Sequence, residues 1–230
     1  MPGFSIIIPT YNEAENIRVL IPRLAKAMEQ VLLDYEIIVV DDNSPDATAK
    51  VAMGYSSKYP VKVYIRPGKL GLSSAVIYGA RKASHEYVIV MDADLQHPPE
   101  KAPDIAKALL RGCDIVVASR YTVGGGISGW SKFRLLESRI ATLLAYMILP
   151  TTRRTTDPMS GFFGCRREYL LDQRIRAIGY KILLEILYLN PGARVCDVPY
   201  VFRSRLYGGS KLSSKVILDY IRQLIMRRLG

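Results

Sequence analysis

Two aspartates one residue apart, Asp92 and Asp94, follow the apolar run YVIVM and precede a pair of prolines. If the chain stays extended after a strand, both carboxylates point to the same side of it. Carboxylates that lie close together repel each other unless a cation is nearby, and Mg²⁺ or Mn²⁺ is commonly held by one or two carboxylates together with substrate phosphates. The pattern suggests a metal and nucleotide-diphosphate site, whereas a lone Asp-x-Asp is more often a helix cap or a turn.

Polar segments also follow the other strand-like runs of the first half of the chain. In open α/β sheets, ligands lie beyond the carboxyl ends of the strands, so these segments are expected to meet in one site. They occupy residues 9–13, 41–46, 66–71, 92–96 and 119–121. Gln96 would add an amide oxygen on the side of the two aspartates.

The elements that must position these segments alternate regularly. Amphipathic segments with helical spacing separate strand-like runs at residues 4–9, 36–40, 61–65, 87–91 and 114–118. Such alternation is typical of a doubly wound, Rossmann-like α/β fold, with a mostly parallel sheet flanked by helices.

The second half of the chain has a different pattern. It predicts a glycine-rich loop, a long apolar helix at about 131–149, a strand-like GFFGC segment, a helix near 179–188 and a strand at 194–202. Residues 212–230 predict an amphipathic helix with basic residues off its apolar face. We expect one domain over residues 1–211, with this helix either packed on the same domain or in contact with a membrane surface.

No segment predicts a membrane span or a secretory signal. The longest charge-free stretch of the second half, residues 140–152, contains a proline and is shorter than the ~20 residues that cross a bilayer. The first residues lack a basic region followed by a long apolar run. We therefore expect no transmembrane helix in this sequence.

The charge and the cysteines narrow the class of partner. The net charge of +11 favours an anionic partner, namely nucleic acid, acidic lipid or a phosphorylated substrate. The basic residues are not interleaved with stacking aromatics, so a nucleic-acid-binding protein is disfavoured. Cys113, Cys165 and Cys196 have no CxxC spacing, and we expect packing residues in a reducing compartment, with neither a disulfide scaffold nor a zinc module.

Other motifs are weak. GGGISG at residues 124–129 fits GxGxxG, but it does not follow the first strand and no acidic residue stands ~20 positions later, so a loop is the better interpretation. His85 and His97 have no metal-ligand spacing. His97 adjoins the two aspartates and is interpreted as an ordinary loop histidine.

Seven motifs, in order and with compatible spacing, carry a resemblance to a known family. They are SIIIPTYNEAENI, YEIIVVDDNSPDAT, VIVMDADLQHPPE, VASRY, GWSKFR with a later SR, DPMSGFFGCRRE and VPYVFRSRLYGGSKL. From residue 4 to about 212 the chain resembles the family 2 glycosyltransferases, and within them the dolichol-phosphate (polyprenyl-phosphate) mannose synthases. The resemblance implies a GT-A fold, GDP-mannose as the donor, Mg²⁺ or Mn²⁺ as the metal, and dolichol or another polyprenyl phosphate as the acceptor.

The same resemblance implies roles for individual residues. The metal motif is matched by Asp92, Asp94 and Gln96, and the expected catalytic residues are Asp94, Arg120 and Arg205. The acceptor phosphate site is matched by Arg120, Arg134, Ser138 and Lys181. The donor site is matched by Pro9, Tyr11, Glu13, Val40, Asp42, Asp92, Ala93, Asp94, Arg205 and Lys211.

The implied mechanism needs no general base. A phosphate monoester has a second pKa of ~6, so it is mostly dianionic at neutral pH and can attack the anomeric carbon directly, with inversion. Family 2 enzymes that glycosylate sugar hydroxyls use a carboxylate in an ED pair, and the corresponding TTDPMSGFF has no such pair. Arg205, Lys211 and the metal would stabilise the nucleoside diphosphate as it leaves.

Two points stay open at this stage. UDP-glucose or another UDP-sugar is the alternative donor, because the base-pocket residues tolerate either nucleobase. A lipid acceptor implies a peripheral protein on the cytoplasmic face of a membrane, held at the membrane surface by its own basic and apolar helices or by a small membrane-anchoring subunit.

Overall fold

The computed structural model describes residues 2–31, 33–176, 181–203 and 214–228, with the backbone alone for residues 214–219. Its strands are β1 (Phe4–Thr10), β2 (Tyr35–Asp41), β3 (Val61–Ile65), β4 (Tyr87–Val90), β5 (Ile115–Ser119), β6 (Gly126–Ile127), β7 (Phe163–Arg166), β8 (Val195–Pro199) and β9 (Val201–Phe202). Its α-helices are α1 (Ala14–Glu29), α2 (Thr48–Met53), α3 (Leu72–Lys82), α4 (Ala102–Leu110), α5 (Lys132–Ile148), α6 (Arg167–Leu171), α7 (Ile182–Leu189) and α8 (Ser214–Arg228). Short 3₁₀ turns, η1 (Pro99–Lys101) and η2 (Pro150–Arg154), precede α4 and follow α5.

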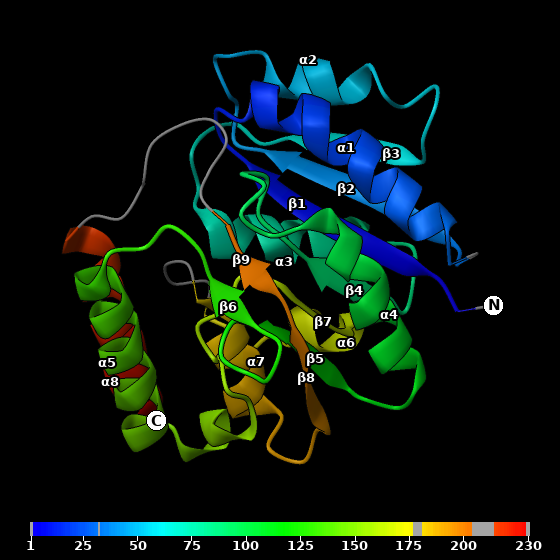
Figure 1. Cartoon of the computed structure of the whole chain (residues 1–230). Helices are drawn as coiled ribbons and strands as arrows, with labels where there is room; N and C mark the ends of the chain where they lie inside the picture. Colours follow the sequence, from blue (N-terminus) through cyan, green and yellow to red (C-terminus); the bar gives the residue numbers. More distant parts are fainter. Residues whose placement is uncertain (1, 32, 177–180, 204–213, 229–230) are drawn as a thin grey trace.

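A seven-stranded sheet with the order β3-β2-β1-β4-β7-β5-β8 forms the centre of the molecule (Figure 1). Only β7 runs antiparallel to its neighbours within this described sheet. The predicted mostly parallel α/β architecture is therefore confirmed. The glycine-rich loop contributes β6, which pairs in parallel with β9 as a separate small sheet.

Helices cover both faces of the sheet because consecutive apolar residues of each buried strand point to opposite sides. On one face, Ile6 and Ile8 of β1 pack with residues of α1 and α4. On the other face, Ile7 packs with residues of α3 and α7. Gly164 in β7 lets α4 approach closely, since a Cβ atom there would lie 2.5 Å from the Ile105 side chain.

The register of the strands brings the polar strand ends to one edge of the sheet. Thr10 at the end of β1 pairs with Asp41 at the end of β2, and the Thr10 hydroxyl donates to Asp41 Oδ1 at 2.8 Å. On the other side of β1, Ile7 pairs with Val90, the last residue of β4. The segments that follow these three strands consequently leave the sheet side by side.

The terminal helix α8 lies beside α5 (Figure 1). Tyr220 and Leu224 of α8 share an apolar cluster with Ala145 of α5 and Leu184 of α7. The described part of the predicted amphipathic helix thus packs on its own domain. Among the described residues, every helix is too short or too polar to cross a bilayer.

The cysteine expectation is wrong for two of the three residues. Cys113, which follows α4, forms a disulfide with Cys196 in β8, and their Cα atoms are 6.0 Å apart. The pairing of Ile115 with Val195 brings together two cysteines that are 83 residues apart in sequence, a proximity that spacing rules cannot reveal. Cys165 is unpaired and buried, as expected of a packing residue, and burial raises the pKa of its thiol.

Candidate active site

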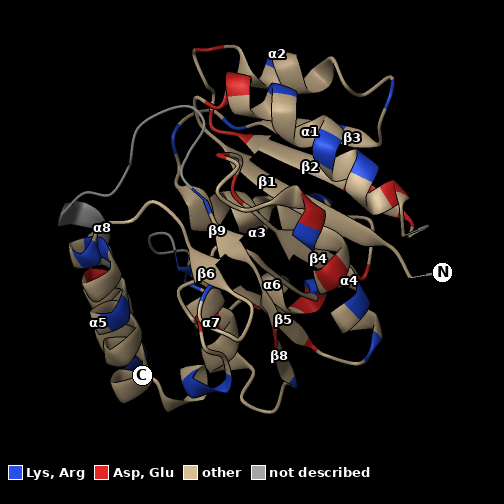
Figure 2. Cartoon of the chain, viewed as in Figure 1, with Lys and Arg blue, Asp and Glu red and all other residues tan. Residues whose placement is uncertain are grey.

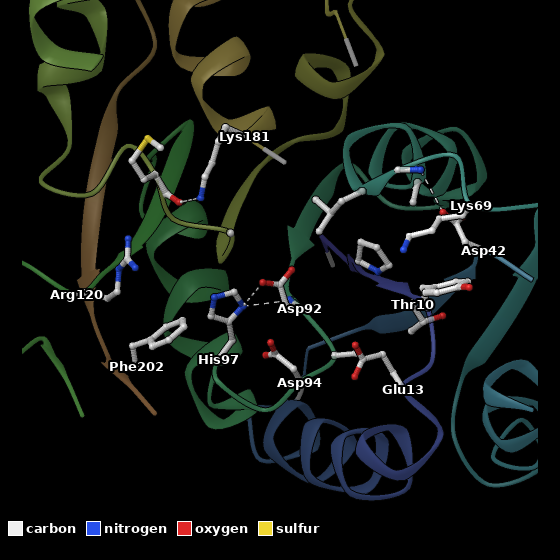
Figure 3. A pocket seen from close by; sticks show the side chains of 18 of the residues that line it. Thr10, Glu13, Asp42, Lys69, Asp92, Asp94, His97, Arg120, Lys181 and Phe202 are labelled. Carbon is white, nitrogen blue, oxygen red and sulfur yellow. Dashed lines mark hydrogen bonds and ion pairs between the residues drawn. The ribbon is translucent and has the colours of Figure 1, made fainter. Parts of the chain in front are cut away.

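A cavity of about 280 Å³ opens at the carboxyl ends of β1, β2 and β4 and extends to the starts of α5 and α7. In Figure 3, Asp92 and Asp94 lie in the middle of this cavity, Arg120 lies at one end and Asp42 at the other. Many of the residues selected from the sequence line it, namely Pro9, Tyr11, Glu13, Asp42, Asp92, Ala93, Asp94, Arg120, Arg134 and Lys181.

The segment that carries the two aspartates turns sharply at Leu95. This residue has a φ of 62°, in the left-handed region that residues other than glycine rarely adopt, and its side chain is buried in the core. The Gln96 N–H donates to Asp94 Oδ1 at 3.1 Å. The chain is therefore not extended through the motif, and this turn, not strand geometry, brings both carboxylates to the cavity.

His97 fixes the backbone of this segment. The Asp92 N–H donates to His97 Nδ1 at 3.1 Å, and the imidazole stacks on Phe162 with ring centroids 5.2 Å apart. Burial lowers the pKa of His97 to about 4, so at neutral pH the ring is uncharged and carries its proton on Nε2. The 3.7 Å approach of Nδ1 to Asp92 Oδ2 is thus not an ion pair. His97 lines the cavity and positions Asp92. The sequence did not indicate this role, because His97 has no metal-ligand spacing and was interpreted as an ordinary loop histidine.

Asp42 lies at the end of the cavity formed by β1 and β2. Arg66 Nε donates to Asp42 Oδ1 at 2.6 Å, and the N–H groups of Leu70 and Gly71 donate to Oδ2 at 3.0 and 3.2 Å. These contacts hold a buried carboxylate in one orientation, where it can accept hydrogen bonds from a ligand.

An aromatic ring and a second carboxylate lie at the same end. Lys69 Nζ is 4.4 Å from the centre of the Tyr11 ring, within the range of a cation–π contact. Asn16 donates to Glu13 Oε2 at 2.6 Å. Val40 differs from the other residues expected here, because its side chain is fully buried in the apolar cluster between the sheet and α3 and does not line the cavity.

Arg120 at the opposite end is held by Asp157. Its Nε and Nη2 each donate to a carboxylate oxygen of Asp157 at 2.7 Å, and its backbone N–H donates at 3.1 Å. Burial alone would lower the pKa of Arg120, but the hydrogen bonds and charge of Asp157 raise it. Arg120 lines the cavity. Its Nη1 is not one of the two guanidinium nitrogens that donate to Asp157.

Arg134 and Lys181 bring two further cations to this end of the cavity. The Arg134 guanidinium lies over the Trp130 ring at 4.4 Å from its centre. Lys181 Nζ donates to the Met159 carbonyl at 2.9 Å. Burial, followed by the charge of Arg120, lowers the pKa of Lys181 to about 8, so a neighbouring anion would stabilise its charged form.

Two further expected site residues, Ser138 and Gln96, do not line the cavity. Ser138 on α5 forms a hydrogen bond with the Tyr121 hydroxyl at 2.8 Å and is not part of the cavity wall. Gln96 is buried, and its amide nitrogen donates to the Arg203 carbonyl at 3.0 Å. Arg205 and Lys211 lie outside the described residues.

The donors in the middle of the cavity fit a hard divalent cation. Asp92 and Asp94 supply carboxylate oxygens and open to a space large enough for phosphate oxygens and water. Within the described part of the chain, no group of three or more His, Cys, Asp or Glu side chains could hold a metal ion. One or two carboxylates are the usual protein share of a Mg²⁺ or Mn²⁺ site that substrate phosphates complete.

Several residues of the site were not named individually from the sequence. Three of them, Lys69, Trp130 and Phe202, line the cavity. The fourth, Asp157, does not line the cavity but accepts hydrogen bonds from the Arg120 guanidinium. Lys69 lies in the polar segment 66–71, which was expected at the site, and Asp157 begins the motif DPMSGFFGCRRE, so each residue had a signal in the sequence. Trp130 and Phe202 are apolar residues whose place in the wall depends on the pairing of β6 with β9.

Known proteins resemble this chain over most of its length. The profile of Glycosyl transferase family 2 matches residues 5–172. The chain is 47% identical over 220 residues to dolichol-phosphate mannosyltransferase of Pyrococcus furiosus, covering 96% of this chain and 62% of that protein. It is 38% identical to the Saccharomyces cerevisiae enzyme of the same name, covering 96% of this chain and 85% of that protein. The chain thus spans less than two thirds of the length of the Pyrococcus relative.

Solved structures with the same fold are more distant in sequence. Glucosyl-3-phosphoglycerate synthase of Mycobacterium tuberculosis superposes with a TM-score of 0.72 at 21% identity, covering 99% of this chain and 80% of that chain. Mannosyl-3-phosphoglycerate synthase of Rubrobacter xylanophilus gives a TM-score of 0.69 at 21% identity, covering 99% and 74%. These likenesses establish the GT-A fold. From the profile match and the identity to its relatives, this chain belongs to glycosyl transferase family 2.

Proposed function

We propose that this chain transfers mannose from GDP-mannose to the phosphate of dolichol or a related polyprenol, with inversion at the anomeric carbon. The observation that carries the proposal is the order of groups along one cavity. The paired carboxylates Asp92 and Asp94 lie in its middle, with Arg120 and Lys181 at one end (Figure 3). Arg134 lies over the same Trp130 ring as Arg120 and so adds a third cation to that end. A nucleotide sugar and a phosphate acceptor need these groups in this order.

The donor is assigned to the end formed by β1 and β2. Tyr11 offers a face for the nucleobase, while Glu13 and Asp42 can accept hydrogen bonds from base N–H or ribose hydroxyl groups. Asp92 and Asp94 would hold a divalent cation, which supplies charge stabilisation for the diphosphate. Arg205 and Lys211 remain predicted contacts of the same diphosphate.

The acceptor phosphate is assigned to the cationic end. Arg134, Lys181 and the remaining donors of Arg120 can bind its oxygens and aim one of them at the anomeric carbon. That oxygen forms the new bond as the bond from the anomeric carbon to the diphosphate breaks, and GDP leaves with the electron pair. The dianionic nucleophile has no proton to lose, so the reaction needs no general base. Asp157, whose carboxylate accepts hydrogen bonds from Arg120, therefore need not act as one.

A lipid acceptor requires access to a membrane surface, and α5 has the face for it. Its exposed apolar side chains recur every three or four residues and are 50% to 70% exposed: Phe133, Leu136, Ile140, Leu143 and Met147. Figure 2 shows basic residues on α5, and these are Lys132, Arg134 and Arg139, in the first half of the helix. An exposed apolar stripe with basic flanks suits the surface of an anionic bilayer, so we assign the chain a peripheral position there, on the cytoplasmic face.

The activity test combines the purified protein, Mg²⁺ or Mn²⁺, a radiolabelled donor and dolichyl phosphate, with organic-phase product counted. GDP-mannose should give lipid-linked product, and Asp94→Asn should lower the rate by at least about a hundredfold. UDP-glucose serves as the second donor arm. Product from UDP-glucose alone would replace mannose by glucose in the proposal, and no product from either donor would refute it.

The membrane assignment is tested separately by sedimentation with vesicles of phosphatidylglycerol and phosphatidylcholine. Leu136→Glu with Ile140→Glu places two charges on the exposed stripe and should reduce the bound fraction without changing the fold, because both side chains are exposed. Ile65→Glu, a change at another exposed apolar residue on the edge strand β3, is the matched control. Equal binding by both variants would contradict the assignment to α5.

A further inference from the structure

The terminal helix α8 is fastened to the chain at Lys181. The Gln223 side-chain amide, which is 2% exposed, donates to the Lys181 carbonyl at 3.1 Å and to Glu185 Oε1 at 2.9 Å. Lys181 immediately precedes α7, and Glu185 lies in the first turn of that helix. One side chain of α8 thus holds both the residue that reaches the cavity and the helix that follows it.

Arg227, one turn further along α8, strengthens this attachment. Its Nε donates to Glu185 Oε2 at 2.9 Å, and its Nη2 donates to the Arg174 carbonyl at 2.6 Å. Glu185 is 1% exposed and Arg227 is 7% exposed. A buried ion pair is a poor guide to net stability, but it tolerates few arrangements of its partners. The pair therefore restricts how α7 can lie against α8.

Helix α8 also reaches the residue that receives the Lys181 ammonium. Lys181 Nζ donates to the Met159 carbonyl at 2.9 Å. The Met159 side chain belongs to the apolar cluster that contains Tyr220 and Leu224 of α8. Contacts of α8 consequently fix both ends of Lys181, its backbone through Gln223 and its ammonium through Met159.

We propose that Gln223 and Arg227 are positioning residues for the acceptor phosphate, and that they act by setting the location of the Lys181 ammonium in the cavity. The ligand class, a phosphate group, rests on the proposed function; the contacts between α8 and Lys181 do not. The terminal helix is then part of the acceptor site, although Gln223 and Arg227 do not line the cavity themselves.

Gln223→Met tests this with little change of volume, because it removes two hydrogen-bond donors and keeps an unbranched side chain. We expect the KM for dolichyl phosphate to rise about threefold to tenfold, the range for losing one or two hydrogen bonds, with GDP affinity unchanged. Gln30→Met, the same change at an exposed position after α1, is the matched control. A loss of stability alone would instead alter both substrates together with the melting temperature.

A double-mutant cycle decides whether Gln223 acts through Lys181. In a Lys181→Met background, Gln223→Met should have no further effect on the KM, since the group that it positions is gone. Additive effects of the two changes would overturn the proposal.

A measurement that needs no activity separates this inference from the proposed function. After reductive ¹³C-methylation, the NMR signal of Lys181, assigned with Lys181→Arg, should shift in Gln223→Met and stay in place in Gln30→Met. An unchanged signal in Gln223→Met would also overturn the proposal. Absence of transfer product from the wild-type protein would refute only the proposed function.

Discussion

The disulfide between Cys113 and Cys196 makes a quantitative prediction about stability. It closes a loop of 83 residues that ties the end of α4 to the sheet strand β8. In the chain-entropy model, such a cross-link destabilises the unfolded chain by about 4.5 kcal/mol. For a domain of this size each kcal/mol corresponds to about 2–4 °C, so loss of the bond should lower the melting temperature by roughly 9–18 °C.

The assay is thermal unfolding followed by circular dichroism, on oxidised protein, on protein reduced with a phosphine, and on a variant with Cys113→Ser and Cys196→Ser. The reduced protein and the variant should melt at similar temperatures, both well below the oxidised protein. Reductant should not change the variant further, because Cys165 is unpaired. Peptide mapping without reductant should recover the linked pair. A shift below 2 °C, or no linked peptide, would refute the reasoning.

Three further predictions follow from the described contacts. Because the pKa of Lys181 is lowered to about 8, its side chain loses its positive charge as the pH rises through that value. The kcat/KM for dolichyl phosphate should therefore fall about tenfold from pH 7.5 to 9. Lys181→Arg should flatten this pH profile, because arginine stays charged over this range. Asp157→Asn removes the counter-charge of a buried guanidinium and should lower the free energy of unfolding in urea by about 3 kcal/mol; an effect below 1 kcal/mol would contradict the buried pair. Gly164→Ala places a Cβ atom 2.5 Å from Ile105 and should destabilise the protein by about 1–3 kcal/mol in the same assay, whereas an unchanged midpoint would mean that α4 can move away.

The fold was predictable to the extent that each element is set by its own residues. Apolar runs bounded by polar segments located β1 to β5 within one or two residues, because the buried strands of a parallel sheet consist mainly of apolar residues. The place of β7 between β4 and β5 was not predictable. It depends on pairing between residues far apart in the chain. The disulfide depends in the same way on the pairing of β5 with β8.

The candidate site was predictable where a residue touches the ligand space and less so where it supports another residue. Asp92, Asp94 and Arg120 follow strands directly, so strand ends indicated them. His97 and Asp157 act on the backbone of Asp92 and on the guanidinium of Arg120. Such supporting contacts depend on tertiary packing, and the spacing of the residues in the sequence does not encode them.

The three cations at the end of the cavity proposed to bind the acceptor are not equivalent, and the difference bears on how the site would work. Arg120 is already neutralised in two-point contact with Asp157, so its main contribution is directional hydrogen bonding. The ammonium of Lys181 has only the Met159 carbonyl as its described hydrogen-bond partner, and burial and Arg120 lower its pKa. A phosphate that arrives beside Lys181 would reverse that shift, so binding should take up a proton at a pH above 8. This coupling would make Lys181, and the α8 contacts that hold it, a pH-sensitive part of the proposed acceptor site.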